Sequence, residues 1–161
     1  MRRIRLPNVT LIAVAASYFI QIGAGFFALA AVGRVVSAAP PRSLAMLQGE
    51  YRYDSSAFWQ IVPPITAALF LLATIANWKT PRRGMLLGAF AIFLLGGIVT
   101  GGVLAPFFAD IVATGYSDTV SSELQRRASI WYASVPGVRY VDAAAGIALL
   151  VALTRPTTDR A

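Results

Sequence analysis

Four long apolar stretches, separated by shorter polar segments, dominate the chain. A helix rising about 1.5 Å per residue needs about 20 such residues to cross the ~30 Å hydrocarbon core of a bilayer. The pattern therefore predicts an all-α fold, a four-transmembrane-helix bundle that forms one integral membrane domain over residues 1–161. The predicted spans cover residues 9–32, 58–78, 84–106 and 135–153.

The first stretch follows a basic tip and has a signal peptide as its alternative interpretation. Its 9–32 run is longer than the roughly 7–15 apolar residues of a signal peptide, so we interpret it as a span. The second span contains Pro63 and Pro64 near its start. Because proline removes a helical hydrogen bond, we expect either a kink there or a helix that begins at Pro64.

The two longer loops carry patterns typical of short interfacial helices. In the first loop, Pro40-Pro41 ends the preceding helix and opens a short one that reaches Gln48. In the second loop, apolar residues from about Thr119 onward recur at helical spacing, which predicts an amphipathic helix lying on the membrane. We expect Pro136-Gly137 to separate this helix from a short fourth span.

Glycines are concentrated in the third predicted span. Small residues repeat at four-residue spacing in the pairs Gly84/Gly88 and Gly97/Gly101. In membranes such faces let helices approach closely, since dispersion contacts replace the hydrophobic drive. We therefore expect this span to pack against the first or the fourth.

Composition narrows the chemistry. The chain is 57% hydrophobic and 13% charged, well below the roughly 25% charged residues of soluble domains. Cysteine and histidine are absent, which removes thiolate chemistry, the commonest metal ligand and the usual general base. We expect no metal and no cofactor. The net charge of +7 sits beside apolar runs, so we assign it to anionic headgroups of the lipid bilayer and not to nucleic acid.

Basic residues also predict the topology. They concentrate in the 79–83 turn and at the two ends, as Arg2, Arg3, Arg5, Arg155 and Arg160, and are sparser in the long loops. We therefore expect an integral protein of a bacterial-type inner or plasma membrane, and the positive-inside rule places both of its termini in the cytoplasm.

The candidate site centres on two charges at the start of the fourth span. Arg139 and Asp142 are three residues apart, so they share a helix face and can pair. The structural alternative is an ion pair snorkelling to the outer interface, and the expected Pro136-Gly137 break favours that position. The functional alternative is a pocket for an apolar molecule with an anionic or phenolic group. The candidate ligand-binding residues are Arg139, Asp142, Trp131, Asp110, Gln21 and Tyr18; the alternative for Gln21 is a structural hydrogen bond between helices.

Several motifs resemble one family of membrane proteins. They are the loop at 40–48, the F-W-x-x-x-P-P opening at 58–64, the KTPRR turn, the Ala105-Pro106 end of the third span, and Trp131 followed by Arg139. In these features the chain resembles the DUF1772 (anthrone oxygenase-like) family. The resemblance implies a four-span fold and carries over Pro106, Trp131 and Arg139. The family's usual Asn and His are replaced by the 107–108 phenylalanines and Pro136, which weakens the implied oxygenase activity.

Three functions remain open from the sequence. The first is the binding of a small hydrophobic or aromatic molecule, or a lipid, within the bundle. The second is cofactor-independent oxygenation of an anthrone-like substrate, with Arg139 stabilising a phenolate. The third is an accessory subunit that uses its glycine faces and loop helices to form a homo-oligomer or to dock a larger membrane partner.

Overall fold

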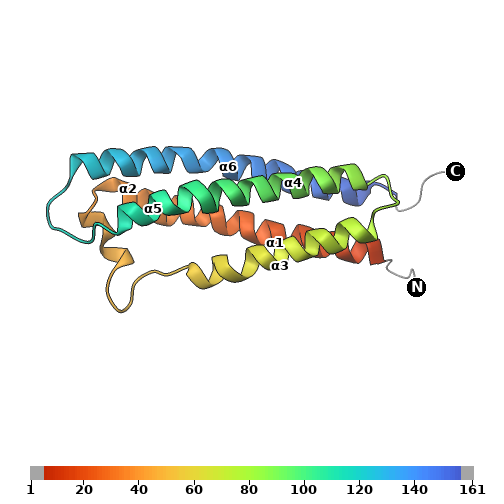
Figure 1. Ribbon diagram of the computed structural model, residues 1–161, viewed down its shortest axis with the longest axis horizontal. Helices are drawn as coiled ribbons and strands as arrows, with labels where there is room; N and C mark the ends of the chain where they lie inside the picture. Colours follow the sequence, from red (N-terminus) through yellow and green to blue (C-terminus); the bar gives the residue numbers. More distant parts are fainter. Residues whose placement is uncertain (1–5, 157–161) are drawn as a thin grey trace.

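The computed structural model describes residues 6–156, which form four long helical rods running antiparallel along one axis (Figure 1). The predicted all-α four-helix membrane bundle is confirmed, because each rod contains a helix long and apolar enough to cross a membrane. Arg2, Arg3, Arg5 and Arg160 lie outside the described residues. In chain order the elements are α1 (Leu6–Phe27), the π-helix η1 (Ala28–Gly33), α2 (Arg34–Ala38), the 3₁₀ helix η2 (Arg42–Leu47), α3 (Ser56–Ala76), α4 (Arg83–Val99), the π-helix η3 (Thr100–Leu104), α5 (Ala105–Val112) and α6 (Ser122–Thr154).

Three rods are longer than predicted, whereas α3 is not. The first, third and fourth rods are continuous over Leu6–Ala38, Arg83–Val112 and Ser122–Thr154. At about 1.5 Å per residue these rods are ~45–50 Å long, against ~31 Å for α3. Since α3 alone matches the hydrocarbon thickness, the other rods extend ~15–20 Å beyond it. They do so at the end that carries both longer loops, which we call the loop end; the opposite end is the basic end.

The fourth rod does not break at Pro136-Gly137, so that prediction was wrong. Leu124 and Ala128, on the predicted amphipathic stripe, are buried, and the buried positions Val135 and Arg139 continue the same face of α6. One packing surface therefore holds the helix straight through a proline that removes a single backbone hydrogen bond. The helix predicted to lie on the membrane is the first part of α6 itself.

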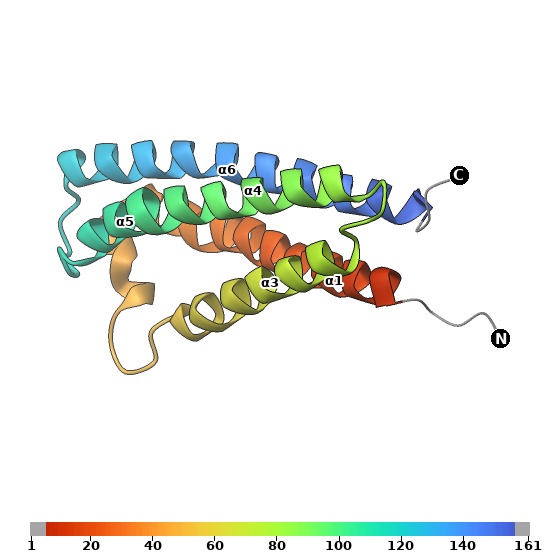
Figure 2. The same cartoon turned by 45° about the vertical axis from the view of Figure 1, so that its right-hand side comes forward.

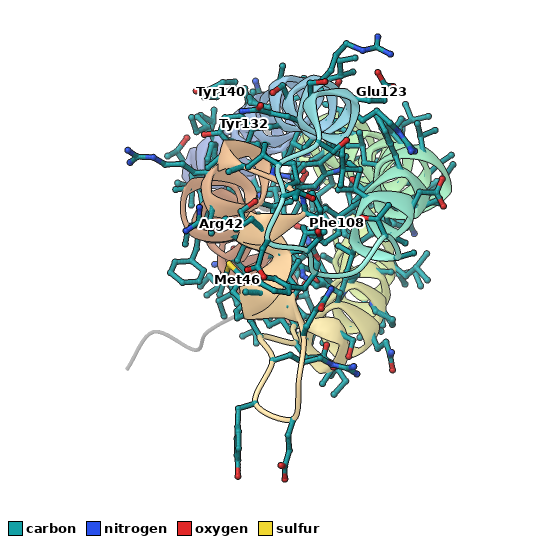
Figure 3. The ribbon with its side chains drawn as sticks, turned by 90° about the vertical axis from the view of Figure 1, so that its left-hand side faces the viewer. Arg42, Met46, Phe108, Glu123, Tyr132 and Tyr140 are labelled. Atoms are coloured by element: carbon teal, nitrogen blue, oxygen red, sulfur yellow. The ribbon has the colours of Figure 1, made fainter. Side chains whose placement is uncertain are left out.

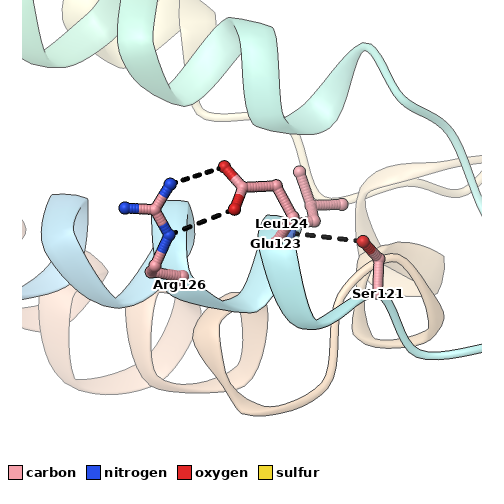
Figure 4. Close-up of polar contacts among 4 residues, drawn as sticks. All are labelled: Ser121, Glu123, Leu124 and Arg126. Carbon is pink, nitrogen blue, oxygen red and sulfur yellow. Dashed lines mark hydrogen bonds and ion pairs between the residues drawn. The ribbon is translucent and has the colours of Figure 1, made fainter.

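The start of α6 is well capped. The Ser121 hydroxyl accepts a hydrogen bond from the Leu124 amide at 3.3 Å, satisfying one of the free donors of the first turn (Figure 4). Arg126 donates to both carboxylate oxygens of Glu123, at 2.8 and 3.1 Å. Both side chains of this pair are exposed, so the cap does more than the ion pair to fix where the helix begins.

The structure also excludes one of the two alternatives for Pro63 and Pro64 in the second rod. Helix α3 begins at Ser56, whose amide donates to the Asp54 carboxylate at 2.8 Å. Pro63 and Pro64 both lie inside it. The alternative in which the helix begins at Pro64 was therefore wrong.

Two hydrophobic clusters hold the rods together. The larger one joins α1, α3, α4 and α6, with Tyr18, Phe70 and Phe93 meeting edge to face or tilted at centroid distances of 5.3–5.7 Å. The smaller one, at the loop end, joins Val32, Val36, Leu44, Ile111, Leu124 and Ala128. We call the elements around this second cluster the outer cap. Viewed from the loop end, Tyr132 and Tyr140 lie at the periphery of the bundle and Phe108 lies nearer its centre (Figure 3).

The outer cap is also tied by hydrogen bonds between the two loops. The Ser121 amide donates to the Pro40 carbonyl at 3.0 Å, and the Gln125 side chain donates to the Ala38 carbonyl at 2.9 Å. The predicted short helix of the first loop is confirmed as η2, and Gly49 follows it with a φ of 81°, which favours glycine.

At the basic end one arginine joins three rods. Arg82 is 3% exposed, and its guanidinium donates to the Asn8 side chain at 2.6 Å, to the Leu153 carbonyl at 3.2 Å and to the Arg155 carbonyl. The last carbonyls of a helix lack partners within it, so Arg82 satisfies the end of α6 while holding the start of α1. From the sequence alone, Arg82 was only one of the basic residues that predict the topology.

Candidate functional site

The central polar feature is a buried ion pair on α6. Arg139 Nη1 lies 3.1 Å from Asp142 Oδ2, and the two residues are 5% and 4% exposed. The predicted pairing across one helix face is confirmed. The pair does not snorkel toward an interface, because both side chains point into the bundle and bind other rods.

Two further helices complete the polar cluster. From α1, the Tyr18 hydroxyl donates to Asp142 Oδ1 at 2.8 Å. From η3, the Thr100 hydroxyl accepts from Arg139 Nη2 at 3.0 Å. Both carboxylate oxygens of Asp142 are thus hydrogen-bonded, as a buried charge requires.

The cluster lies well inside the length of α6. Because α6 is unbroken, Asp142 and Arg139 lie ~18 and ~22 Å along the helix from Thr154 at the basic end. A hydrocarbon layer as thick as α3 is long, ~31 Å, and level with that helix would contain both charges on the loop side of its middle. The helix break that placed them near the outer interface is absent, and their depth in the bilayer stays a prediction.

Two glycines make room for these charges. A Cβ atom at Gly25 of α1 would lie 2.8 Å from Arg139 Cδ, and one at Gly96 of α4 would lie 3.1 Å from Asp142 Oδ1. Larger side chains at either position would push the pair out of its place. These glycines explain how two charged side chains fit between helices that pack closely.

A cavity of about 770 Å³ begins at this cluster and runs toward the loop end. Its deep end is bordered by Gln21, Thr100, Arg139 and Asp142. Its wall is mainly apolar and includes Val32, Trp59, Leu104, Phe108, Trp131 and Val135. Residues 52–56 of the first loop and α3 border it at the loop end. The ribbon views show why there is space, since the Ser56 end of α3 diverges from α4 and α5 (Figures 1 and 2).

The glycine-rich third rod contributes to this space. The prediction that it packs against the first or fourth rod is confirmed, as α4 packs along α6. The expected close contacts of the pairs Gly84/Gly88 and Gly97/Gly101 are not formed: a Cβ atom at any of the four would meet nothing within 4 Å. Gly97 and Gly101 instead line the cavity. Their missing side chains keep it open.

The structure brings most of the predicted site residues together. Gln21, Trp131, Arg139 and Asp142 border the cavity, and Tyr18 lies behind Asp142. Asp110 does not join them, because its exposed side chain lies 3.9 Å from Arg127 on the outer cap.

Gln21 does not make the structural hydrogen bond considered as an alternative. Its neighbour Ser17 does so, with its hydroxyl 2.7 Å from that of Thr66 on α3. The Gln21 Oε1 atom is buried and has no hydrogen-bond partner among residues 6–156. Gln21 is therefore a polar cavity residue whose acceptor is unsatisfied.

Trp131 fixes the cavity wall near the outer cap. Its indole Nε1 donates to the Leu104 carbonyl at 2.9 Å, and the centroids of the Trp131 and Phe108 rings are 4.6 Å apart. Leu104 ends the π-helix η3, and π-helical turns are frequent at functional sites. The sequence did not single out Thr100 or Phe108 as site residues; the signal for Thr100 is that it is a lone threonine in an apolar span.

The chain matches no protein-family model, curated protein or solved structure. The resemblance to the DUF1772 family therefore stays a prediction. Within residues 6–156, no group of three or more His, Cys, Asp or Glu side chains could hold a metal ion.

Proposed function

We propose that this small four-span membrane protein binds a small hydrophobic or aromatic molecule, or a lipid, within its bundle. The observation that carries the proposal is the 770 Å³ cavity with a buried polar cluster at its deep end. Ligand pockets typically measure about 300–1,000 Å³ and combine apolar walls with a few convergent polar groups. Both properties fit the cavity.

The packing around the cavity also supports a binding role. The cavity is open on one side, so its lining atoms gain dispersion contacts only from a molecule that enters it. The cavity is kept open by Gly97 and Gly101, where larger residues would fit without a clash. A bound molecule would supply the contacts that side chains at these two positions do not.

The membrane is the natural source of the ligand. Helix α3 packs mainly against α1 and contacts α4 less extensively. Its diverging end lies in the loop-side half of the hydrocarbon, where the cavity also lies. A molecule dissolved in that leaflet reaches the cavity between α3 and α4 without crossing water.

Filling the cavity tests the proposal. The variant Gly97→Leu places a side chain in the cavity, whereas Gly88→Leu makes the same change on an exposed face of the same helix, and neither added Cβ meets an obstacle. Mass spectrometry of organic extracts from the purified proteins should find a small molecule in the wild type and in Gly88→Leu but not in Gly97→Leu. Equal recovery from both variants would contradict binding in the cavity.

Oxygenation of an aromatic substrate is a second candidate, which the DUF1772 resemblance also implies. The specific observation is that Asp142 borders the cavity and is a carboxylate able to accept a proton there. Its two oxygens already accept hydrogen bonds from Tyr18 and Arg139, so neither is free to take a proton from a substrate, which favours binding over catalysis. Oxygen uptake with an anthrone, lost in Asp142→Asn, would support this activity; no uptake by the folded wild type would rule it out.

A further inference from the structure

The unsatisfied acceptor of Gln21 indicates that the ligand brings a hydrogen-bond donor. Gln21 is 9% exposed and borders the deep end of the cavity, and its Oε1 has no partner among the described residues. A buried polar atom without a hydrogen bond lowers stability. Thr74 Oγ1 and Asn77 Oδ1 are also buried without a partner among the described residues, but of these three residues only Gln21 borders the cavity. Rotation about the last torsion of glutamine is soft, so Oε1 can turn toward a donor in the cavity.

The charges around the cavity favour a neutral ligand. At the deep end Arg139 is neutralised by Asp142, and at the loop end Arg52 is accompanied by Asp54. A carboxylate or phosphate entering the deep end would add an uncompensated charge inside the hydrocarbon layer. A hydroxyl or amide N–H would bring a donor without a charge.

The shape of the cavity favours an elongated molecule. Along α6 the cavity runs from Asp142 to Trp131, which is ~16 Å at the helical rise. The wall between these ends is mainly apolar. A chain or ring system of that length would therefore lie along the bundle axis with one polar end beside Gln21.

From these three observations, and resting on the proposed function, we propose that Gln21 selects an uncharged, elongated amphiphile whose hydroxyl or N–H donor binds Gln21 Oε1 at the deep end. The apolar body extends past Trp131 toward the loop end. Gln21 is thus a specificity-determining residue, and the ion pair of Arg139 and Asp142 forms the neutral polar floor on which the donor rests.

Quenching of Trp131 fluorescence by brominated probes tests this inference. In a Trp59→Phe, Trp78→Phe background Trp131 is the single tryptophan, and it lies ~12 Å above Arg139 along α6. The probes are ω-bromoundecanol, its methyl ether and ω-bromoundecanoate, which share a chain and differ in the polar end. A hydroxyl at Gln21 places the bromine near Trp131. The matched protein variants are Gln21→Leu and the exposed Gln60→Leu, and Gly97→Leu measures quenching from outside the cavity.

We expect saturable quenching by the alcohol that Gly97→Leu removes. Gln21→Leu should weaken it about three- to ten-fold, the range for one neutral hydrogen bond, while Gln60→Leu should not. The methyl ether should bind as weakly to the wild type as the alcohol does to Gln21→Leu, and the carboxylate should bind more weakly than the alcohol. If ether and alcohol bind equally and Gly97→Leu removes both, the selection by Gln21 is wrong and cavity binding stands. If Gly97→Leu changes quenching by none of the probes, both proposals fail.

Discussion

Replacing Asp142 with asparagine should leave the Arg139 guanidinium buried without its counter-charge. In the wild type the two groups are 3.1 Å apart, their side chains are 7% and 6% exposed, and the second carboxylate oxygen binds Tyr18. Breaking a buried pair by removing one partner costs about 3–5 kcal/mol. Asparagine keeps one oxygen acceptor, so we expect a loss of unfolding free energy near 3 kcal/mol, the lower end of that range.

Reversible unfolding in mixed detergent micelles, followed by circular dichroism, measures this loss. Asp110→Asn is the matched control, because that carboxylate also lies near an arginine, at 3.9 Å, but its side chain is 72% exposed. We expect the control to change stability by less than about 0.5 kcal/mol. A double variant, Arg139→Met with Asp142→Leu, should recover most of the loss, because it removes both charges together.

A stability loss in Asp142→Asn no larger than that in Asp110→Asn would contradict a buried, water-excluded ion pair. Such a result would mean that water or lipid headgroups reach the Arg139 charge. The cluster would then be solvated, and the low-polarity environment on which the inference of a neutral ligand depends would be absent.

Three further predictions concern packing and topology. Arg82→Ala should lower the unfolding free energy by about 1–3 kcal/mol in the same assay, because the carbonyls at the end of α6 lose their hydrogen-bond donor. The control Arg83→Ala, at the neighbouring exposed arginine, should lower it by less than about 1 kcal/mol. Equal losses would contradict the role of Arg82. Gly25→Ala should cost about 1–3 kcal/mol, since its Cβ meets the buried arginine at 2.8 Å, and an unchanged stability would show that this side chain can move aside. The chain has no cysteine, so a single cysteine introduced at Thr80 or at Tyr51 can be labelled with a membrane-impermeant maleimide. In intact cells we expect labelling only at Tyr51, because the predicted topology places the 79–83 turn in the cytoplasm. Labelling only at Thr80 would invert the predicted orientation.

The fold was predictable because apolar length is a local property. Each rod shows a run of residues long enough to span a membrane, and the three-residue spacing of Arg139 and Asp142 was enough to predict their pairing. The boundaries were less predictable. Pro136 reads as a break in isolation, but the face formed by Leu124, Ala128 and Val135 packs continuously and holds α6 together.

The cavity was not predictable, since it depends on how rods diverge. Glycines at Gly97 and Gly101 have the spacing of a tight helix contact, yet they face empty space because α3 leans away from α4 near the loop end. Asp110 shares the acidic chemistry of Asp142 but lies on the outer cap, a difference that only the three-dimensional arrangement reveals.

Structure determination of the purified protein in a lipid bilayer would show directly whether the cavity holds a ligand. Binding in the cavity predicts elongated non-protein density between α3, α4 and α6, running from Gln21 past Trp131, with one end within hydrogen-bond distance of the Gln21 side chain. A bundle in which α3 packs against α4 along its whole length, with protein side chains filling the space beside Gly97, would contradict it.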